Sequence, residues 1–195
     1  KTQEGSLLLA VSNTGKSRTT FSAIDNGYEY LSEDLTILDK KCIYATPLIS
    51  AQSSMLPSKN LALKYNLFVN SLTGVNMLLP RIPTLSSFRN FFSQHDVAYK
   101  AKPSRIFILE KGIDSISKLT KMEALRKILI LNRLELSYSR DHLLLAYSYF
   151  NATLDMESLN MIVKQIIQDV VSNADCFLVT SNSPERYLEL IDTLT

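Results

Sequence analysis

The chain has 195 residues, of which 46% are hydrophobic and 21% charged. These values are typical of a globular protein that buries its own core, and we expect a single domain over residues 1–195. The net charge of +2 is too small to indicate nucleic acid or an anionic membrane as a partner. No apolar run approaches the roughly 18–20 residues that cross a bilayer. The first residue is Lys1 rather than Met, which is consistent with a segment that precedes it.

The first predicted elements are a strand, a turn and a helix. Leu7–Val11 is a continuous apolar run within Ser6–Val11, which predicts a strand buried on both faces. The polar turn Ser12–Gly15 follows it. Lys16–Asn26 is expected to be a helix that ends at Gly27, with Phe21 and Ile24 facing inward.

The rest of the chain alternates between strand and helix patterns. Apolar residues three and four apart predict helices over Thr120–Leu136 and Asp155–Ser172, and Thr120 with Glu123 forms a capping box. The interleaving predicts an α/β fold with a mixed sheet flanked by helices. The other expected elements are extended segments at Tyr28–Leu38 and Cys42–Ile49, short helices within 61–72 and 86–94, strands Arg105–Leu109 and Cys176–Val179, and a terminal helix opening at Ser183-Pro184.

The turn after the first strand carries a phosphate-binding pattern. The residues Ala10-Val-Ser-Asn-Thr-Gly15-Lys16-Ser17 match GxxxxGK[ST] with Ala in the first glycine position. In such a loop the backbone N–H groups and the helix N-terminus surround a polyphosphate, the lysine contacts its outer phosphates, and the serine hydroxyl binds Mg²⁺. We therefore expect ATP and Mg²⁺ as cofactors. The expected nucleotide-binding residues are Ala10, Ser12, Asn13, Thr14, Gly15, Lys16, Ser17 and Arg18. The alternative is a plain strand–turn–helix with a chance Gly-Lys-Ser.

Two adjacent carboxylates end the next extended segment, in Ser32-Glu33-Asp34. Beside a phosphate loop, one can bind Mg²⁺ and the other can accept the proton of an attacking hydroxyl. Elsewhere in a fold the same pair would be a solvated acidic turn.

These two motifs together resemble a known family. The similarity rests on Gly15-Lys-Ser17, the helix after it, and the run Gly27-Tyr-Glu-Tyr-Leu-Ser-Glu-Asp34-Leu-Thr-Ile-Leu38. This arrangement is similar to the catalytic domain of HPr kinase/phosphorylase, and more so to HPr-kinase-related proteins. The resemblance implies a P-loop fold near the phosphoenolpyruvate carboxykinase type and ATP-dependent phosphorylation of a serine-like hydroxyl on a peptide, protein or small molecule. It implies Lys16 and Asp34 as catalytic residues, with Asp34 the general base, and Ser17 and Glu33 as metal ligands. By analogy with ring-forming members, it also implies a homo-oligomer. The two cysteines, Cys42 and Cys176, lie in apolar stretches and form no CxxC, so we expect a reducing, cytoplasmic compartment.

The chain also departs from the family. The family's catalytic histidine lies upstream of its phosphate loop, before Lys1, and the segment Met55–Lys64 holds no acid where a metal-binding glutamate is expected. The kinase half-reaction is therefore better supported than the phosphorylase reaction. A nucleotide-binding regulatory or partner-binding module without phosphotransfer, and a slow ATPase, remain the alternatives.

Further charged residues are candidates for the same site. Glu110, just past its strand, can lie at the cleft if that strand runs parallel to the first strand; the alternative is an ordinary exposed strand-end acid. Each arginine is a candidate for balancing transition-state charge or belongs to a solvated face: Arg81, Arg105, Arg126, Arg133 and Arg140.

Overall fold

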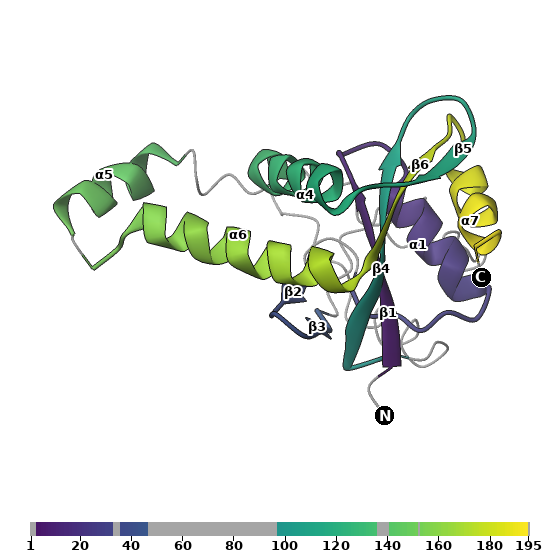
Figure 1. Ribbon diagram of the computed structural model, residues 1–195, viewed down its shortest axis with the longest axis horizontal. Helices are drawn as coiled ribbons and strands as arrows, with labels where there is room; N and C mark the ends of the chain where they lie inside the picture. Colours follow the sequence, from purple (N-terminus) through teal and green to yellow (C-terminus); the bar gives the residue numbers. More distant parts are fainter. Residues whose placement is uncertain (1–2, 33–35, 47–96, 136–140, 152, 195) are drawn as a thin grey trace, which may run out of the picture. The chain divides into compact units, whose positions relative to one another are not determined.

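The structure is a computed structural model that describes residues 3–32, 36–46, 97–135, 141–151 and 153–194 (Figure 1). It is a mixed α/β protein with an open mixed sheet flanked by helices, as the sequence predicts at this level. The chain divides into two compact units, residues 1–16, 38–43 and 101–195 in one, and residues 17–37 and 44–100 in the other. The elements in chain order are β1 (Gln3–Ala10), α1 (Lys16–Asp25), β2 (Ile37–Leu38), β3 (Ile43–Tyr44), β4 (Lys100–Glu110), β5 (Ser115–Lys118), α4 (Lys121–Glu135), α5 (His142–Phe150), α6 (Met156–Asn173), β6 (Asp175–Thr180) and α7 (Pro184–Asp192).

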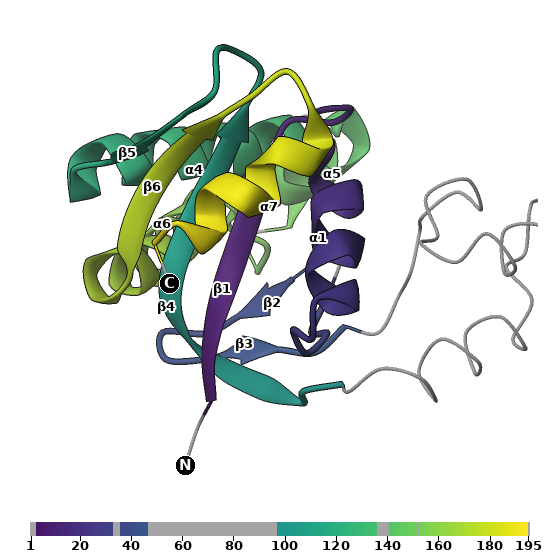
Figure 2. The same cartoon turned by 90° about the vertical axis from the view of Figure 1, so that its right-hand side faces the viewer.

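Three parallel strands form the centre of the sheet in the first unit. β4 pairs in parallel with β1 on one side and β6 on the other, and β5 is antiparallel to β6 (Figure 2). The strand order is β2-β3-β4-β6-β5, with β1 attached to β4. The register aligns Ala10 with Leu109 and Glu110 with Thr180, so the carboxyl ends of the three parallel strands lie at one edge.

One face of this sheet is covered by α7. Alternation along β4 and β6 places Phe107, Leu109 and Val179 on this face. They form a buried cluster with Ala10 and with Tyr187 and Ile191 of α7 (Figure 2). The cluster fixes the start of α7 beside the carboxyl edge of the strands.

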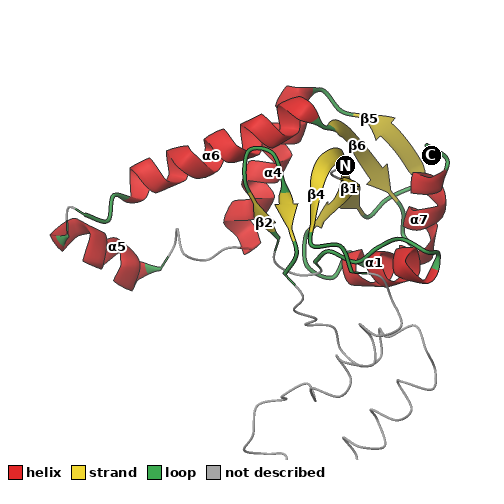
Figure 3. Ribbon diagram, turned by 90° about the horizontal axis from the view of Figure 1, so that it is seen from below, coloured by secondary structure: helices red, strands yellow, loops and turns green. Residues whose placement is uncertain are grey.

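The opposite face is covered by α4 and α6 (Figure 3). Ile106, Ile108 and Cys176 alternate with the first set and are buried. The helices bury Ala124 and Ile128 from α4, and Ile167, Val170 and Val171 from α6. Met122, an apolar residue on the first turn of α4, is 80% exposed.

Helix starts follow the predicted capping chemistry. In α4, the Glu123 N–H donates to Thr120 Oγ1 (3.3 Å) and the Thr120 N–H donates to Glu123 Oε2 (2.9 Å), which confirms the capping box. These contacts lower the pKa of Glu123, with the hydrogen bond from the Thr120 hydroxyl the largest cause. In α6, Asp155 is the N-cap and accepts from the N–H groups of Glu157 and Ser158.

In the second unit, α1 buries Thr19, Phe21 and Ile24, which confirms the predicted inward pair. The helix ends with Gly27 at φ +90°, a conformation that L residues avoid. Beyond it, the described part of the predicted extended segment Tyr28–Leu38 holds parallel bridges of Tyr30 with Val97 and of Ser32 with Thr46, and it ends in β2. The short helices expected within 61–72 and 86–94 lie outside the described residues, as do the candidate arginines Arg81 and Arg140.

Among the helices that can be described, none has the length and apolar character needed to cross a membrane.

Candidate functional site

The segment Ala10–Ser17, called here the candidate phosphate loop, leaves the carboxyl end of β1 and enters α1. Its first half is a tight turn in which the Thr14 N–H and the Thr14 hydroxyl both donate to the Val11 carbonyl (3.3 and 2.8 Å). Asn13 has φ 65° at the third position of this turn, where asparagine tolerates positive values better than most residues. The local sequence therefore accounts for the turn.

Gly15 occupies a position that no other residue fits without strain. Its φ is +115°, and a Cβ built on it would lie 2.8 Å from the ring carbons Cβ and Cγ of Pro184. Pro184 is the first residue of α7. The sequence predicts a glycine here because phosphates must approach closely, and the structure gives a second reason, which is the packing of α7 against the loop.

The first turn of α1 concentrates positive charge. Lys16, Ser17 and Arg18 begin the helix, and the turn holds no acidic residue. The helix dipole places partial positive charge at the same end of the helix. Helix N-termini of this kind bind anions such as phosphate.

An anionic group of the protein already contacts the loop. The Ser12 N–H donates to Glu135 Oε1 at 3.1 Å, and the Ser12 hydroxyl lies 3.1 Å from both carboxylate oxygens. Glu135 is the last residue of α4 and lies 123 positions away in the sequence, so no local pattern predicted the contact. Carboxylate and phosphate oxygens accept the same charge-assisted hydrogen bonds. The loop's donors therefore fit a phosphate group in their chemistry.

The carboxyl edge of β4 holds a second ion pair. Glu110 was expected at the cleft only if its strand ran parallel to the first strand, and β4 is parallel to β1. Its Oε1 accepts a hydrogen bond from Lys127 Nζ of α4 at 2.6 Å, so this carboxylate is paired with a lysine that sequence analysis did not single out. The pair ties α4 to the strand end.

A third cluster joins the start of β5 to α7. Asp114 accepts hydrogen bonds from the Ser181 hydroxyl (2.7 Å) and from Arg186 Nε (3.0 Å), and these bonds, that of Ser181 foremost, lower the pKa of the Asp114 carboxyl. The Tyr187 hydroxyl contacts the carbonyls of Glu110 and Ser181, and burial raises its pKa. These groups satisfy one another, so the cluster holds α7 in place beside the loop.

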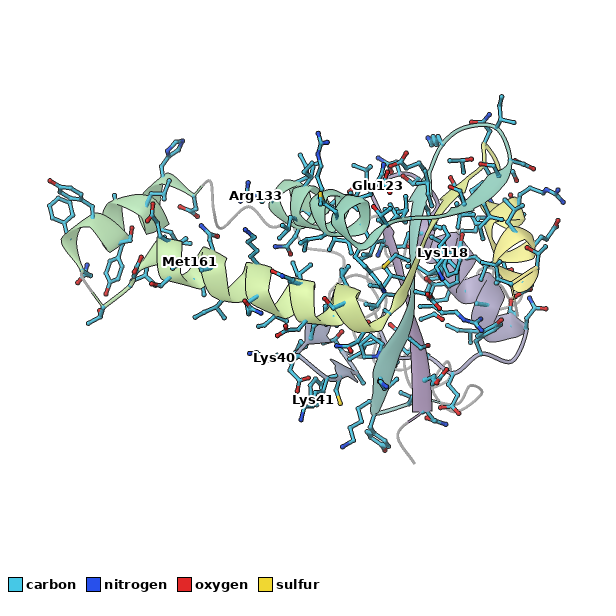
Figure 4. The ribbon with its side chains drawn as sticks, viewed as in Figure 1. Lys40, Lys41, Lys118, Glu123, Arg133 and Met161 are labelled. Atoms are coloured by element: carbon cyan, nitrogen blue, oxygen red, sulfur yellow. The ribbon has the colours of Figure 1, made fainter. Side chains whose placement is uncertain are left out.

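The remaining predicted residues divide into two sets. Glu33 and Asp34 lie outside the described residues, and the structure does not bear on their roles. Their flanks are described, since the hydroxyls of Ser32 and Thr36 hydrogen-bond at 2.8 Å. Among the predicted arginines, Arg105 is half-buried in β4, while Arg126 and Arg133 are exposed on α4 (Figure 4).

The residues fit the expected cofactors unequally. The loop donors fit phosphate oxygens, and Ser17 stands at the helix start where a Mg²⁺-binding hydroxyl is expected. Within the described ranges, no group of three or more His, Cys, Asp or Glu residues comes together as a metal site.

Comparison with known proteins adds no family to these observations: no protein-family model, curated protein or solved structure matches the chain.

Proposed function

We propose that the chain binds the phosphates of ATP at the candidate phosphate loop and transfers the γ-phosphate to a hydroxyl of a peptide, protein or small molecule. The contact of Ser12 with the Glu135 carboxylate carries this proposal. It supports an anionic oxygen as the ligand of the loop, at the strand-to-helix turn where Lys16 and Arg18 add positive charge.

Each residue of the loop has a role in the proposed reaction. Ser12 donates to a phosphate oxygen in place of the internal carboxylate. Lys16 neutralises charge on the outer phosphates, and Ser17 supplies a hydroxyl ligand to Mg²⁺. When bound, Mg-ATP supplies the phosphoryl group and the leaving group, ADP.

The two acids that follow in the sequence complete the proposal, on the strength of the family resemblance. Asp34 accepts the proton of the acceptor hydroxyl, so that the hydroxyl oxygen can form its bond to phosphorus while the bond to the bridging oxygen breaks. Glu33 binds the metal ion or its water shell. Glutamate keeps the charge of the family's aspartate on a longer side chain.

Nucleotide binding is tested first, by calorimetric titration of ATP with and without Mg²⁺. We expect Mg²⁺-dependent binding that Lys16→Ala weakens by about tenfold or more. Lys41→Ala is the matched control, because Lys41 is an exposed lysine outside the loop (Figure 4). Absence of binding, or equal loss in both variants, would overturn the proposed site.

Transfer is tested separately with γ-labelled ATP, serine peptides and small hydroxyl compounds, using mass spectrometry to identify products. Asp34→Asn should bind ATP like the wild-type protein and lose transfer, because the amide does not accept the hydroxyl proton. Substantial transfer by this variant would remove Asp34 as the base.

The Glu135 contact also favours a second candidate, a nucleotide-responsive module without transfer. Phosphates entering the loop displace the last residue of α4, so binding would release the end of that helix. The expected result is faster amide exchange in α4 on ATP binding with no labelled phosphate transferred. Any transfer to an acceptor excludes this candidate.

A further inference from the structure

An exposed apolar surface includes α5 and the first turns of α6, two helices of the first unit that are joined by a short loop (Figures 1 and 3). We call it the α5–α6 patch. Its main side chains are between 57% and 84% exposed, and they are Leu143, Tyr147, Tyr149, Phe150, Met161 and Ile162 (Figure 4).

α5 differs from an ordinary surface helix in having no polar face. A helix that is apolar on all sides is normally buried, yet α5 has no buried residue. By contrast, α6 buries Ile167, Val170 and Val171 near its carboxyl end, and Met156 at its start. Between these, Met161 and Ile162 are 64% and 57% exposed.

The patch is large enough for a stable interface. Its three aromatic side chains, at about 200 Å² each when fully exposed, present roughly 450 Å² to solvent. The side chains of Leu143, Met161 and Ile162, at about 120 Å² each when fully exposed, raise the exposed apolar area to roughly 700 Å². Three partly exposed leucines of the same helices bring the area near the ~800 Å² that each partner buries in a standard interface. The largest apolar patch of a typical monomer is about 300–600 Å².

The charge and composition of the patch distinguish between occupants. No charged residue occurs between Leu143 and Leu154. Helices that lie on a membrane surface carry lysine and arginine on their polar side, which α5 lacks. The α5 part of the patch therefore meets its own copy without like-charge repulsion, and Tyr, Phe and Met are enriched in such interfaces. On α6, Glu157 and Lys164 flank the patch with opposite charges.

We propose that the α5–α6 patch is the contact between two copies of this chain, related by a two-fold axis. The proposal stands on the area, charge and composition of the patch and is independent of nucleotide binding. In the dimer, each copy covers apolar side chains of its partner's α5 that are exposed in the single chain.

The test measures molecular mass by light scattering during size exclusion, at chain concentrations of about 1 to 100 µM. The wild-type protein should dimerise in this range. Tyr149→Glu and Phe150→Glu should each raise the dissociation constant by about 30-fold or more, because they bury a charge in the interface. Tyr99→Glu is the matched control, since Tyr99 is 88% exposed and lies outside the patch.

The outcomes separate the occupants. A dimer that both patch variants dissociate and the control leaves intact establishes the interface. A monomer at every concentration overturns it, as does a dimer that the patch variants do not weaken. Sedimentation of a monomer with phosphatidylcholine–phosphatidylserine vesicles would also overturn it, because a membrane would then cover the patch. Both substituted residues are exposed in the single chain, so the variants should fold like the wild-type protein, and circular dichroism checks this.

Discussion

Replacing Gly15 with alanine perturbs the junction between the candidate phosphate loop and α7 in two independent ways. The backbone is held at φ +115°, and the new Cβ would lie 2.8 Å from two carbons of the Pro184 ring. That ring has little freedom to move, because α7 is anchored by the buried side chain of Tyr187 and its hydrogen bonds. Both penalties therefore fall on the folded state.

The magnitude follows from the two parts. Holding an L residue in so sparsely populated a conformation costs about 1–3 kcal/mol. Overpacking against a rigid neighbour costs about 1–3 kcal/mol more. Alanine recovers about 0.4–1 kcal/mol by restricting the unfolded chain. We expect Gly15→Ala to lower the free energy of unfolding by about 1–5.5 kcal/mol, compared with the 5–15 kcal/mol typical of a protein.

Two other glycines separate these contributions. Gly27 has φ +90° but nothing within 4 Å of a built Cβ, so Gly27→Ala measures backbone strain alone. Gly112 lies outside the left-handed region, and its Cβ would make an ordinary 3.5 Å contact with Thr180, so Gly112→Ala should change stability by less than about 0.5 kcal/mol. The assay is urea unfolding followed by circular dichroism, since the chain has no tryptophan.

The steric part is isolated by a double-mutant cycle with Pro184→Ala. Removing the ring should recover about 1–2 kcal/mol of the Gly15→Ala penalty. The reasoning is refuted if Gly15→Ala is no more damaging than Gly27→Ala, or if the cycle shows no coupling. Either result would mean that α7 does not press on the loop.

Three further predictions concern single side chains. Asp114→Asn should be less stable than the wild-type protein at neutral pH. The hydrogen bond from Ser181, and then that from Arg186, lower the folded pKa of Asp114 below 3.8. The urea midpoint of the variant should therefore lie below that of the wild-type protein above pH 3.8, and the difference should disappear as the pH falls through the lowered pKa. Glu135→Ala should bind ATP about three- to tenfold more tightly in calorimetry by removing the competing carboxylate, and Glu4→Ala, with the same change of charge, should not. The Cys176 thiol, whose pKa is raised by burial, should react with a thiol reagent only after denaturant is added, and reaction at the native rate of the chain's other cysteine would contradict its burial.

The sequence predicted those parts of the fold that local chemistry decides. The strand–turn–helix of β1 and α1 follows from an apolar run, turn residues and Gly27, and the start of α4 follows from Thr120 and Glu123. β5 was missed because Ser115–Lys118 has little apolar alternation and depends on pairing with β6. α5 was missed because a short apolar run does not distinguish a helix from a strand.

What the sequence could not supply was the identity of distant neighbours. Periodicity identifies an apolar helix face but not whether anything covers it, which is why the exposure of Met122 was not predicted. The same limit applies to the candidate site. Gly15 could be explained by phosphates alone until Pro184 was found beside it, and the contact of Glu135 with Ser12 leaves no trace in either local sequence.

The pairing of β1 with β4 has a consequence during protein synthesis. The Ser104 hydroxyl donates to the Gly5 carbonyl across 99 residues, so the first strand made finds its partner only after about half the chain has followed it. At about 5–20 residues per second this delay is roughly 5–20 s. Through that interval the apolar run Leu7–Leu9 lacks its β4 partner in the nascent chain. The order of synthesis thus leaves β1 as a segment to which a ribosome-associated chaperone can bind.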